Sequence, residues 1–151
     1  MRTEPDNSDV APSARTTASA SNLSAQGAYE LAGSDLGEAK VTLFASGSEV
    51  SIALAARALL QTDGIGTRVV STPCWELFDR QSAKTQAAVI GKAKVRVAVE
   101  AGVRMGWERF IGESGGFVGM SSFGASAPYE KLYEAFGITA EAVVAAVKAR
   151  L

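Results

Sequence analysis

Residues 40–50 read KVTLFASGSEV and join a short apolar run to the start of a helix. The apolar run, 41–45, is typical of a buried strand. Ser46 and Glu49 have the S-x-x-E spacing of a capping box, in which the serine hydroxyl bonds the Glu49 amide and the carboxylate reaches back to the Ser46 amide. The stretch therefore predicts a strand that leads directly into a helix over about 49–61, apolar on most of its circumference.

Further strands and helices are predicted to follow one another along the chain. A strand is predicted before residue 41, and further strands at 66–71, 94–100 and 116–120, with helices at 82–90, 128–137 and 139–151 and a short helix before 116. Strands separated by helices predict an α/β fold with a mostly parallel sheet and helices on both faces. In 94–100, KVRVAVE, valines alternate with charged residues, so this strand has either one exposed face or charged ends at the sheet margin.

Composition excludes several classes of protein. The chain has 151 residues, with 15 basic and 16 acidic side chains, and this balance argues against binding to nucleic acid or anionic lipid. Residues 50–60, the most apolar stretch, cover about half of the ~20 residues that a membrane span needs, and Arg57 interrupts them. A single cysteine, Cys74, forbids an intrachain disulfide and fits a reducing compartment. We therefore expect a cytoplasmic location.

Histidine is absent from the sequence. The commonest proton shuttle near neutral pH and the commonest metal ligand are both missing as a result. Ser-His and Cys-His nucleophile pairs and His-ligated zinc sites are excluded.

Residues 1–26 differ in composition from the rest of the chain. Ser, Ala, Thr, Asp and Pro dominate, and large apolar side chains are nearly absent. Such a run cannot bury enough surface to offset the entropy of ordering it, so we predict a flexible linker over 1–26 and one folded domain over 27–151. Acidic residues near the start also argue against a secretory signal.

The turn Ser46-Gly47-Ser48 is the first candidate site, since the N-terminus of a helix offers free N–H groups to a phosphate. However, neither G-x-G-x-x-G nor G-x-x-x-x-G-K-[ST] occurs. The capping box explains these residues and is the favoured interpretation.

Carboxylates and arginines form a second group of candidates. Glu100, Glu108 and Glu113 could act as general acid and base if the fold gathers them. Arg104 and Arg109 could hold an anion, but ion pairs with the same glutamates are an equally open interpretation.

Two further features favour a structural role. Glu76 is the charge closest to Cys74 and has the wrong sign to activate a thiol, which predicts a buried, inert cysteine. Residues 123–128, FGASAP, are either a ligand-facing loop or a tight connection into a helix, and the second is favoured.

Several stretches together resemble one known family. These stretches are GSEVSIALAARALL (47–60), VVSTPCWELFDRQ (69–81), VRVAVEAG (95–102), GWERFIG (106–112) and FGASAPYEKLYEAFGITAEAVV (123–144). In this order and spacing they closely resemble the C-terminal domain of transketolase, over 27–151. The resemblance implies a three-layer α/β/α sandwich with a five-stranded, mostly parallel (mixed) sheet.

The resemblance also implies where the chemistry of the family lies. The whole enzyme is a homodimer that moves a two-carbon ketol unit between phosphorylated sugars, using thiamine diphosphate and a divalent metal, Mg or Ca. The cofactor lies between two other domains, both N-terminal to this one, whose Gly-Asp-Gly motif, activating glutamate and substrate-binding histidines have no counterpart here. We therefore expect no catalytic, cofactor-binding or metal-binding residue in this chain.

Two hypotheses about function follow. In the first, the chain is a non-catalytic structural domain of a transketolase in the pentose phosphate pathway, inactive alone and partnered by the N-terminal and middle domains. It would then be an excised or separately encoded piece with an exposed apolar patch. In the second, it is a standalone α/β module that binds a small ligand or a partner protein in the crevice near 46–48 and 71–75.

Overall fold

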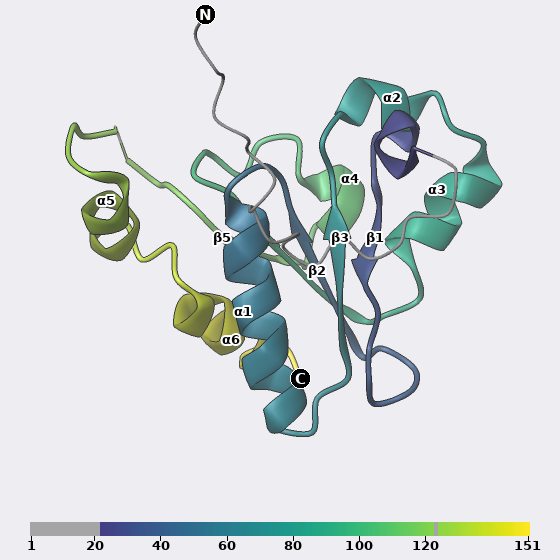
Figure 1. Cartoon of the computed structure of the whole chain (residues 1–151), viewed down its shortest axis with the longest axis horizontal. Coiled ribbons are helices and arrows are strands. Elements are labelled where there is room, and N and C mark those ends of the chain that lie inside the picture. Colours follow the sequence, from purple (N-terminus) through teal and green to yellow (C-terminus); the bar gives the residue numbers. More distant parts are fainter. Residues whose placement is uncertain (1–21, 123) are drawn as a thin grey trace, which may run out of the picture.

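The computed structural model describes residues 22–122 and 124–151, in which helices and strands alternate (Figure 1). The elements in chain order are the 3-10 helix η1 (Leu23–Gln26), β1 (Tyr29–Ala32), β2 (Val41–Ala45), α1 (Glu49–Thr62), β3 (Thr67–Ser71), α2 (Trp75–Asp79), α3 (Ala83–Ile90), β4 (Val95–Val99), α4 (Glu108–Ile111), β5 (Gly116–Val118), α5 (Tyr129–Ala135) and α6 (Ala140–Lys148).

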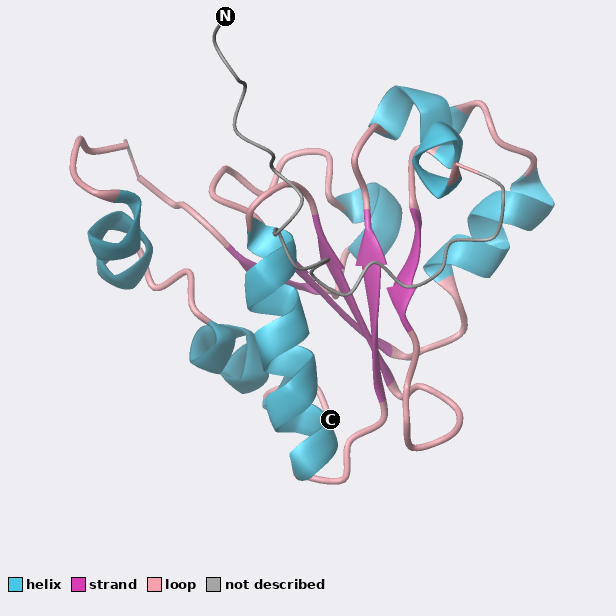
Figure 2. Cartoon of the chain, in the orientation of Figure 1, coloured by secondary structure: helices cyan, strands magenta, loops and turns pink. Residues whose placement is uncertain are grey.

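The five strands form one sheet in the order β1-β3-β2-β4-β5 (Figure 2). β1 pairs antiparallel with β3, and the other three pairs are parallel. The mostly parallel, mixed sheet with helices is thus confirmed. β3 and β4 lie on opposite sides of β2, so the winding of the chain reverses between β2 and β4. This reversal makes the carboxyl ends of β2 and β4 the topological switch point of the sheet.

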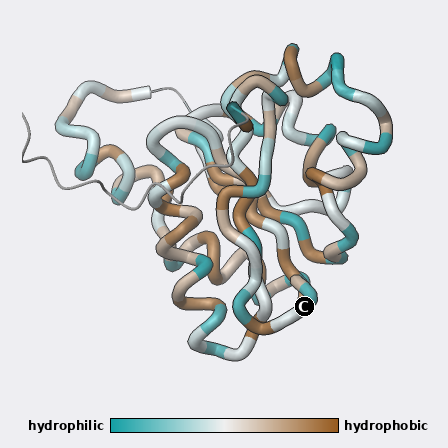
Figure 3. The backbone as a smooth tube through the Cα atoms, turned by 45° about the vertical axis from the view of Figure 1, so that its right-hand side comes forward, coloured by the Kyte–Doolittle hydropathy of each residue, from teal (hydrophilic) through white to brown (hydrophobic). Residues whose placement is uncertain are grey.

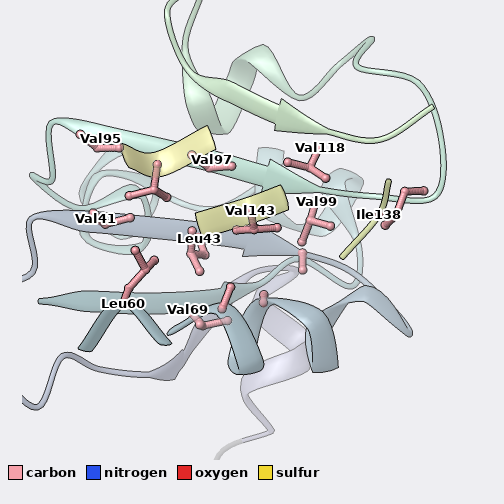
Figure 4. Packing of buried hydrophobic residues seen from close by; sticks show 14 residues of the cluster. Val41, Leu43, Leu60, Val69, Val95, Val97, Val99, Val118, Ile138 and Val143 are labelled. Carbon is pink, nitrogen blue, oxygen red and sulfur yellow. The ribbon is translucent and has the colours of Figure 1, made fainter. Parts of the chain in front are cut away.

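Each face of the sheet has its own core. Odd-numbered residues of β2 pack with α1 and α6, and Figure 4 shows this first core around Leu43, Leu60 and Val143. Phe44 points to the other face, where it packs with Phe78, Trp107 and Phe110 from the α2 to α4 side. Figure 3 shows hydrophobic segments concentrated in the central strands. This period of two residues gives the three-layer arrangement its two separate cores.

β4 decides between the two interpretations of its charged residues. Its valines and Ala98 are buried on both faces, while Lys94 is exposed just before the strand. Arg96 is half-buried and donates to the carbonyls of Gly91 and Ala93. β4 is therefore a central strand that both layers of helices cover. Lys94 and Glu100 flank its ends, and Arg96 near its start is bonded to the preceding turn.

Most predicted elements are found within a residue or two of their expected bounds. The helix over 82–90 is α3, with the Ser82 hydroxyl accepting from the Thr85 amide at its start. Two helices carry no sequence expectation, namely η1 and α2. Residues 1–21 of the predicted linker over 1–26 lie outside the described part of the chain. Of the rest, Leu23–Gln26 form η1.

Within the described part of the chain, no helix is both long enough and apolar enough to cross a membrane.

Candidate functional site

The switch point brings together two polar residues that are far apart in the sequence. Ser46 directly follows β2 and Glu100 directly follows β4, and these strands are parallel neighbours in register. The Ser46 hydroxyl donates to Glu100 Oε2 over 2.8 Å. Two predicted candidates, one from the turn and one from the carboxylate group, therefore meet at the edge where α/β proteins place their ligands.

Helices α1 and α5 complete this site. Glu49, the first residue of α1, is only 4% exposed. Its carboxylate accepts from the Ser48 hydroxyl over 3.0 Å and from the Tyr133 hydroxyl of α5. Ser48 Oγ and the Tyr133 hydroxyl oxygen are also 3.1 Å apart. We call Ser46, Ser48, Glu49, Glu100 and Tyr133 the switch-point cluster.

The predicted capping box is wrong. Ser48, not Ser46, precedes α1, and it makes no capping bond with its side chain. The Glu49 amide donates to the backbone carbonyl of Ser46 over 3.2 Å. Both side chains of the S-x-x-E pattern are taken by residues distant in the sequence, because tertiary contacts with Glu100 and Tyr133 replace the local ones.

The cluster is electrostatically unfavourable for an anion. Burial is the main cause that raises the pKa of Glu100, and the nearby Glu49 carboxylate raises it further against the opposing hydrogen bond from Ser46. Burial and the hydrogen bond to Glu49 raise the pKa of Tyr133. Two carboxylates thus share this edge, and none of the five members of the cluster is basic.

Glu100→Gln should change the pH dependence of stability. Because the pKa of Glu100 is raised on folding, the folded state binds a proton more readily, and stability falls as the pH rises through the raised pKa. Because Glu100 is only half-buried, solvent screens much of this effect, and we expect Glu100→Gln to be more stable than wild type by no more than about 0.5 kcal/mol at about pH 8, with no advantage at pH values below the ordinary glutamate pKa. Urea unfolding across this pH range measures the difference. The exposed Glu113→Gln is the control, and a less stable Glu100→Gln protein at high pH would contradict the assignment.

Tyr133→Phe removes the hydroxyl that links α5 to α1. The buried Glu49 carboxylate then keeps only its bond from Ser48, so we expect the free energy of unfolding to fall by about 1–2 kcal/mol. Tyr129→Phe, on the same helix but 65% exposed, should cost less than about 0.5 kcal/mol. Equal losses in both variants, measured by urea unfolding, would show that the Glu49 bond does not stabilise the fold.

The other predicted carboxylates and arginines form a separate structural network. Arg104 donates to the backbone carbonyls of Gly112, Glu113 and Gly115 and forms an ion pair with Glu108. These bonds fold the segment around α4 back on itself. The carboxylate that raises the pKa of Glu100 belongs to Glu49, while Glu108 pairs with Arg104, so the three predicted glutamates do not form one site.

Arg109 pairs with an aspartate and not with one of the candidate glutamates. It pairs with Asp79 of α2 over 2.7 Å, and its guanidinium lies 5.0 Å from the Trp75 ring centre. The arginine joins α4 to α2 and is not paired with a glutamate.

The remaining two candidates fit structural roles. Cys74 is half-buried, where a buried cysteine was predicted, and its thiol donates to Glu76 Oε2 over 3.5 Å. Within 123–128, Phe123 lies outside the described residues, and residues 124–128 are exposed and lead into α5.

Comparison with known proteins identifies the family. The family model described as the transketolase-like TK C-terminal domain matches residues 27–139. The chain belongs to this family. The stretches quoted from the sequence thus identified it correctly.

Individual relatives agree with this assignment. The transketolase of Rhodobacter capsulatus is 53% identical over an alignment of 146 residues, and the match covers 93% of this chain and 22% of that protein. The structure of transketolase from Leishmania mexicana is 43% identical, with a TM-score of 0.75, over 83% of this chain and 18% of that one. An inactive β4 tetramer of a split-gene transketolase shares the fold, with 24% identity and a TM-score of 0.65, over 82% of this chain and 42% of that one. The chain therefore spans about a fifth of the curated relative and of the Leishmania mexicana enzyme.

The switch-point cluster of this transketolase C-terminal domain does not fit a diphosphate group. Among residues 22–122 and 124–151, no group of three or more Asp, Glu, Cys or His side chains could hold a metal ion. The helix N-terminus at the switch point, which offers N–H groups, carries Glu49 and faces Glu100, and these charges oppose a diphosphate.

Two members of the switch-point cluster escaped sequence reasoning. Tyr133 lies 84 residues from Glu49, and no local motif connects them. Glu49 was assigned to the capping box, and its apolar neighbours in α1 are the one signal that it enters a buried position.

Proposed function

We propose that this chain is the non-catalytic C-terminal domain of a thiamine-diphosphate-dependent transketolase. The whole enzyme would transfer a two-carbon ketol unit between phosphorylated sugars, with the cofactor and a divalent metal held by other domains. The observation that carries this proposal is the family match over 27–139 in a chain that spans 22% of the R. capsulatus enzyme. The lack of a basic side chain in the switch-point cluster supports the non-catalytic role.

The N-terminal and middle domains are the partners in this proposal, in an enzyme that is cytoplasmic and homodimeric. An exposed apolar loop supports packing against them, since Met105 is 81% exposed and Val103 57% exposed. Gly106, next to Met105, lies against the ring of Trp75. Cys74, the residue before Trp75, donates its amide to the Gly27 carbonyl. The exposed loop is therefore close to the point where the chain enters the domain.

The loop holds its apolar side chains outward on a fixed backbone. Arg104 is bonded to three carbonyls, the Gly106 amide donates to Glu108, and Trp107 is 1% exposed. Met105 lies between these anchored residues and cannot fold inward without breaking their contacts. A preorganised apolar side chain of this kind favours a protein partner.

A calorimetric titration and a chimeric enzyme test the catalytic part of the proposal. Calorimetry of the 151-residue chain with thiamine diphosphate and magnesium should show no magnesium-dependent micromolar binding, and ketol transfer should be absent. A chimera of the R. capsulatus transketolase that carries residues 27–151 in place of its own matching segment should be active. Micromolar cofactor binding by the isolated chain, or an inactive but folded chimera, would contradict the proposal and favour a standalone binding module.

Methionine oxidation tests the packing. Hydrogen peroxide should convert Met105 to the sulfoxide much faster than the half-buried Met120 in the isolated chain. In the chimera, we expect oxidation of Met105 to slow by about tenfold or more while that of Met120 changes little. Equal rates of Met105 oxidation in the two proteins, measured by mass spectrometry, would show that the loop is not covered by another domain.

A further inference from the structure

A hollow at the amino edge of the sheet is lined by four basic side chains. Lys40, Lys92, Lys94 and Arg150 line it together with Glu38 and with Leu151, whose terminal carboxylate is a second negative charge in the 151-residue chain. Lys40 immediately precedes β2 and Lys94 immediately precedes β4. The hollow therefore lies at the edge of the sheet opposite to the switch-point cluster, which follows the carboxyl ends of the same strands.

The fold holds these residues next to one another. β2 and β4 are parallel with Val41 opposite Val95, so Lys40 and Lys94 come at the same level of neighbouring strands. The Val95 amide donates to the Lys40 carbonyl over 3.4 Å. Arg96 holds the turn that carries Lys92 through the carbonyls of Gly91 and Ala93.

Arg150 reaches the hollow from the end of α6. Its Nη1 donates to the Ala146 carbonyl over 2.8 Å and its Nε to the Ser114 carbonyl over 3.4 Å. The guanidinium is thus anchored on backbone oxygens and not on a carboxylate. Its charge remains available to a ligand in the hollow.

Among the residues that the structure describes, none forms an ion pair with these four basic side chains. Five ion pairs occur among the described residues, and they involve Arg57, Arg68, Arg104, Arg109 and Lys148. Like charges on neighbouring strands repel one another, and Glu38 and the terminal carboxylate of Leu151 offset two of the four. A bound anion would relieve the remaining repulsion.

We propose that this basic hollow binds a small phosphate-bearing anion, either free phosphate or a phosphate monoester. Lysine ammonium groups bind phosphate as compact point charges, and an anchored guanidinium adds directed N–H groups. Ala39, Ala93 and Val95 also line the hollow, so its walls are partly apolar and suit a small ligand. The site uses none of the residues of the switch-point cluster and does not depend on the proposed function.

Titration of the 151-residue chain tests this site without magnesium and at constant ionic strength. Inorganic phosphate and glucose 6-phosphate are the probes, and they distinguish free phosphate from a monoester. We expect saturable binding of at least one probe with a Kd of roughly 0.1–1 mM, with amide shifts in the NMR spectrum centred on residues 92–95. The affinity should fall as salt is added.

A matched pair of double variants separates a site from general attraction. Lys40→Gln with Lys94→Gln should weaken binding at least about tenfold. Lys84→Gln with Lys131→Gln removes the same charge from exposed positions outside the hollow and should change binding less than about twofold. Absence of saturable binding, or an equal loss in both double variants, would overturn the proposal. Unchanged thermal unfolding of each variant shows that the fold is intact. If the variant of Lys40 and Lys94 unfolds, Lys94→Gln alone replaces it, with Lys84→Gln alone as the matched control.

Discussion

Phe110→Ala is expected to lower the free energy of unfolding by about 3–5 kcal/mol. Phe110 is fully buried in α4, and its ring centre lies 5.1–5.8 Å from four other aromatic rings. These rings belong to Phe44, Trp75, Phe78 and Trp107. Truncation leaves a cavity, because the four rings are held by β2, by α2 and by the backbone just before α4, and these segments cannot all move into the space. This loss is a large fraction of the free energy of unfolding of a typical domain, about 5–15 kcal/mol.

Urea unfolding of Phe110→Ala measures this loss, with Leu36→Ala as its control. Leu36 is 50% exposed in the loop between β1 and β2, so its truncation should cost less than about 0.5 kcal/mol. A loss below about 1 kcal/mol for Phe110→Ala would mean that the second core does not form as described.

Gly27→Ala is expected to cost at least about 3 kcal/mol, through a backbone clash at the entry to the domain. Gly27 has φ +80°, and a Cβ there would lie 2.2 Å from the Phe78 nitrogen and 2.3 Å from the Cys74 carbonyl oxygen. Both neighbours are backbone atoms of the α2 segment and cannot move aside without displacing it. The bond from the Cys74 amide to the Gly27 carbonyl would be lost with that displacement.

Gly37→Ala separates the clash from the backbone strain. Gly37 has nearly the same φ, +81°, but no atom lies within 4 Å of a Cβ built there. Its replacement should therefore cost only the strain of a left-handed alanine, about 1–2 kcal/mol. Thermal or urea unfolding compares the two variants, and equal losses would show that Gly27 is required only for its backbone conformation.

The fold was accessible to sequence reasoning where the signal is local. The apolar run at 41–45 and the valine pattern at 94–100 predicted β2 and β4, because side chains alternate along a strand whatever surrounds it. Helix α2 was missed because its five residues are too few to show a helical period, and packing of Trp75 and Phe78 on Phe110 stabilises it. The residue pattern predicted five strands, the number that the family resemblance also implies and the sheet contains.

The candidate site was accessible only in part. Ser46 and Glu100 were each selected from the sequence, but their meeting depends on the parallel pairing of β2 with β4. The capping box is not formed because the Glu49 carboxylate accepts a hydrogen bond from the hydroxyl of Tyr133, 84 residues away, and does not reach back to the Ser46 amide. The basic hollow likewise depends on strand register, which places Lys40 beside Lys94.

The sequence by itself determined the α/β class, the family and the exclusion of histidine chemistry, since residue identities and short-range periodicity carry this information. The tertiary structure alone decided which side chains share the switch point, which lysines line one hollow, and that Gly27 packs directly against the backbone of the α2 segment. The physical reason is that hydrogen bonds and charges act over a few ångströms in space. Separation along the chain does not report that distance until the sheet has paired its strands.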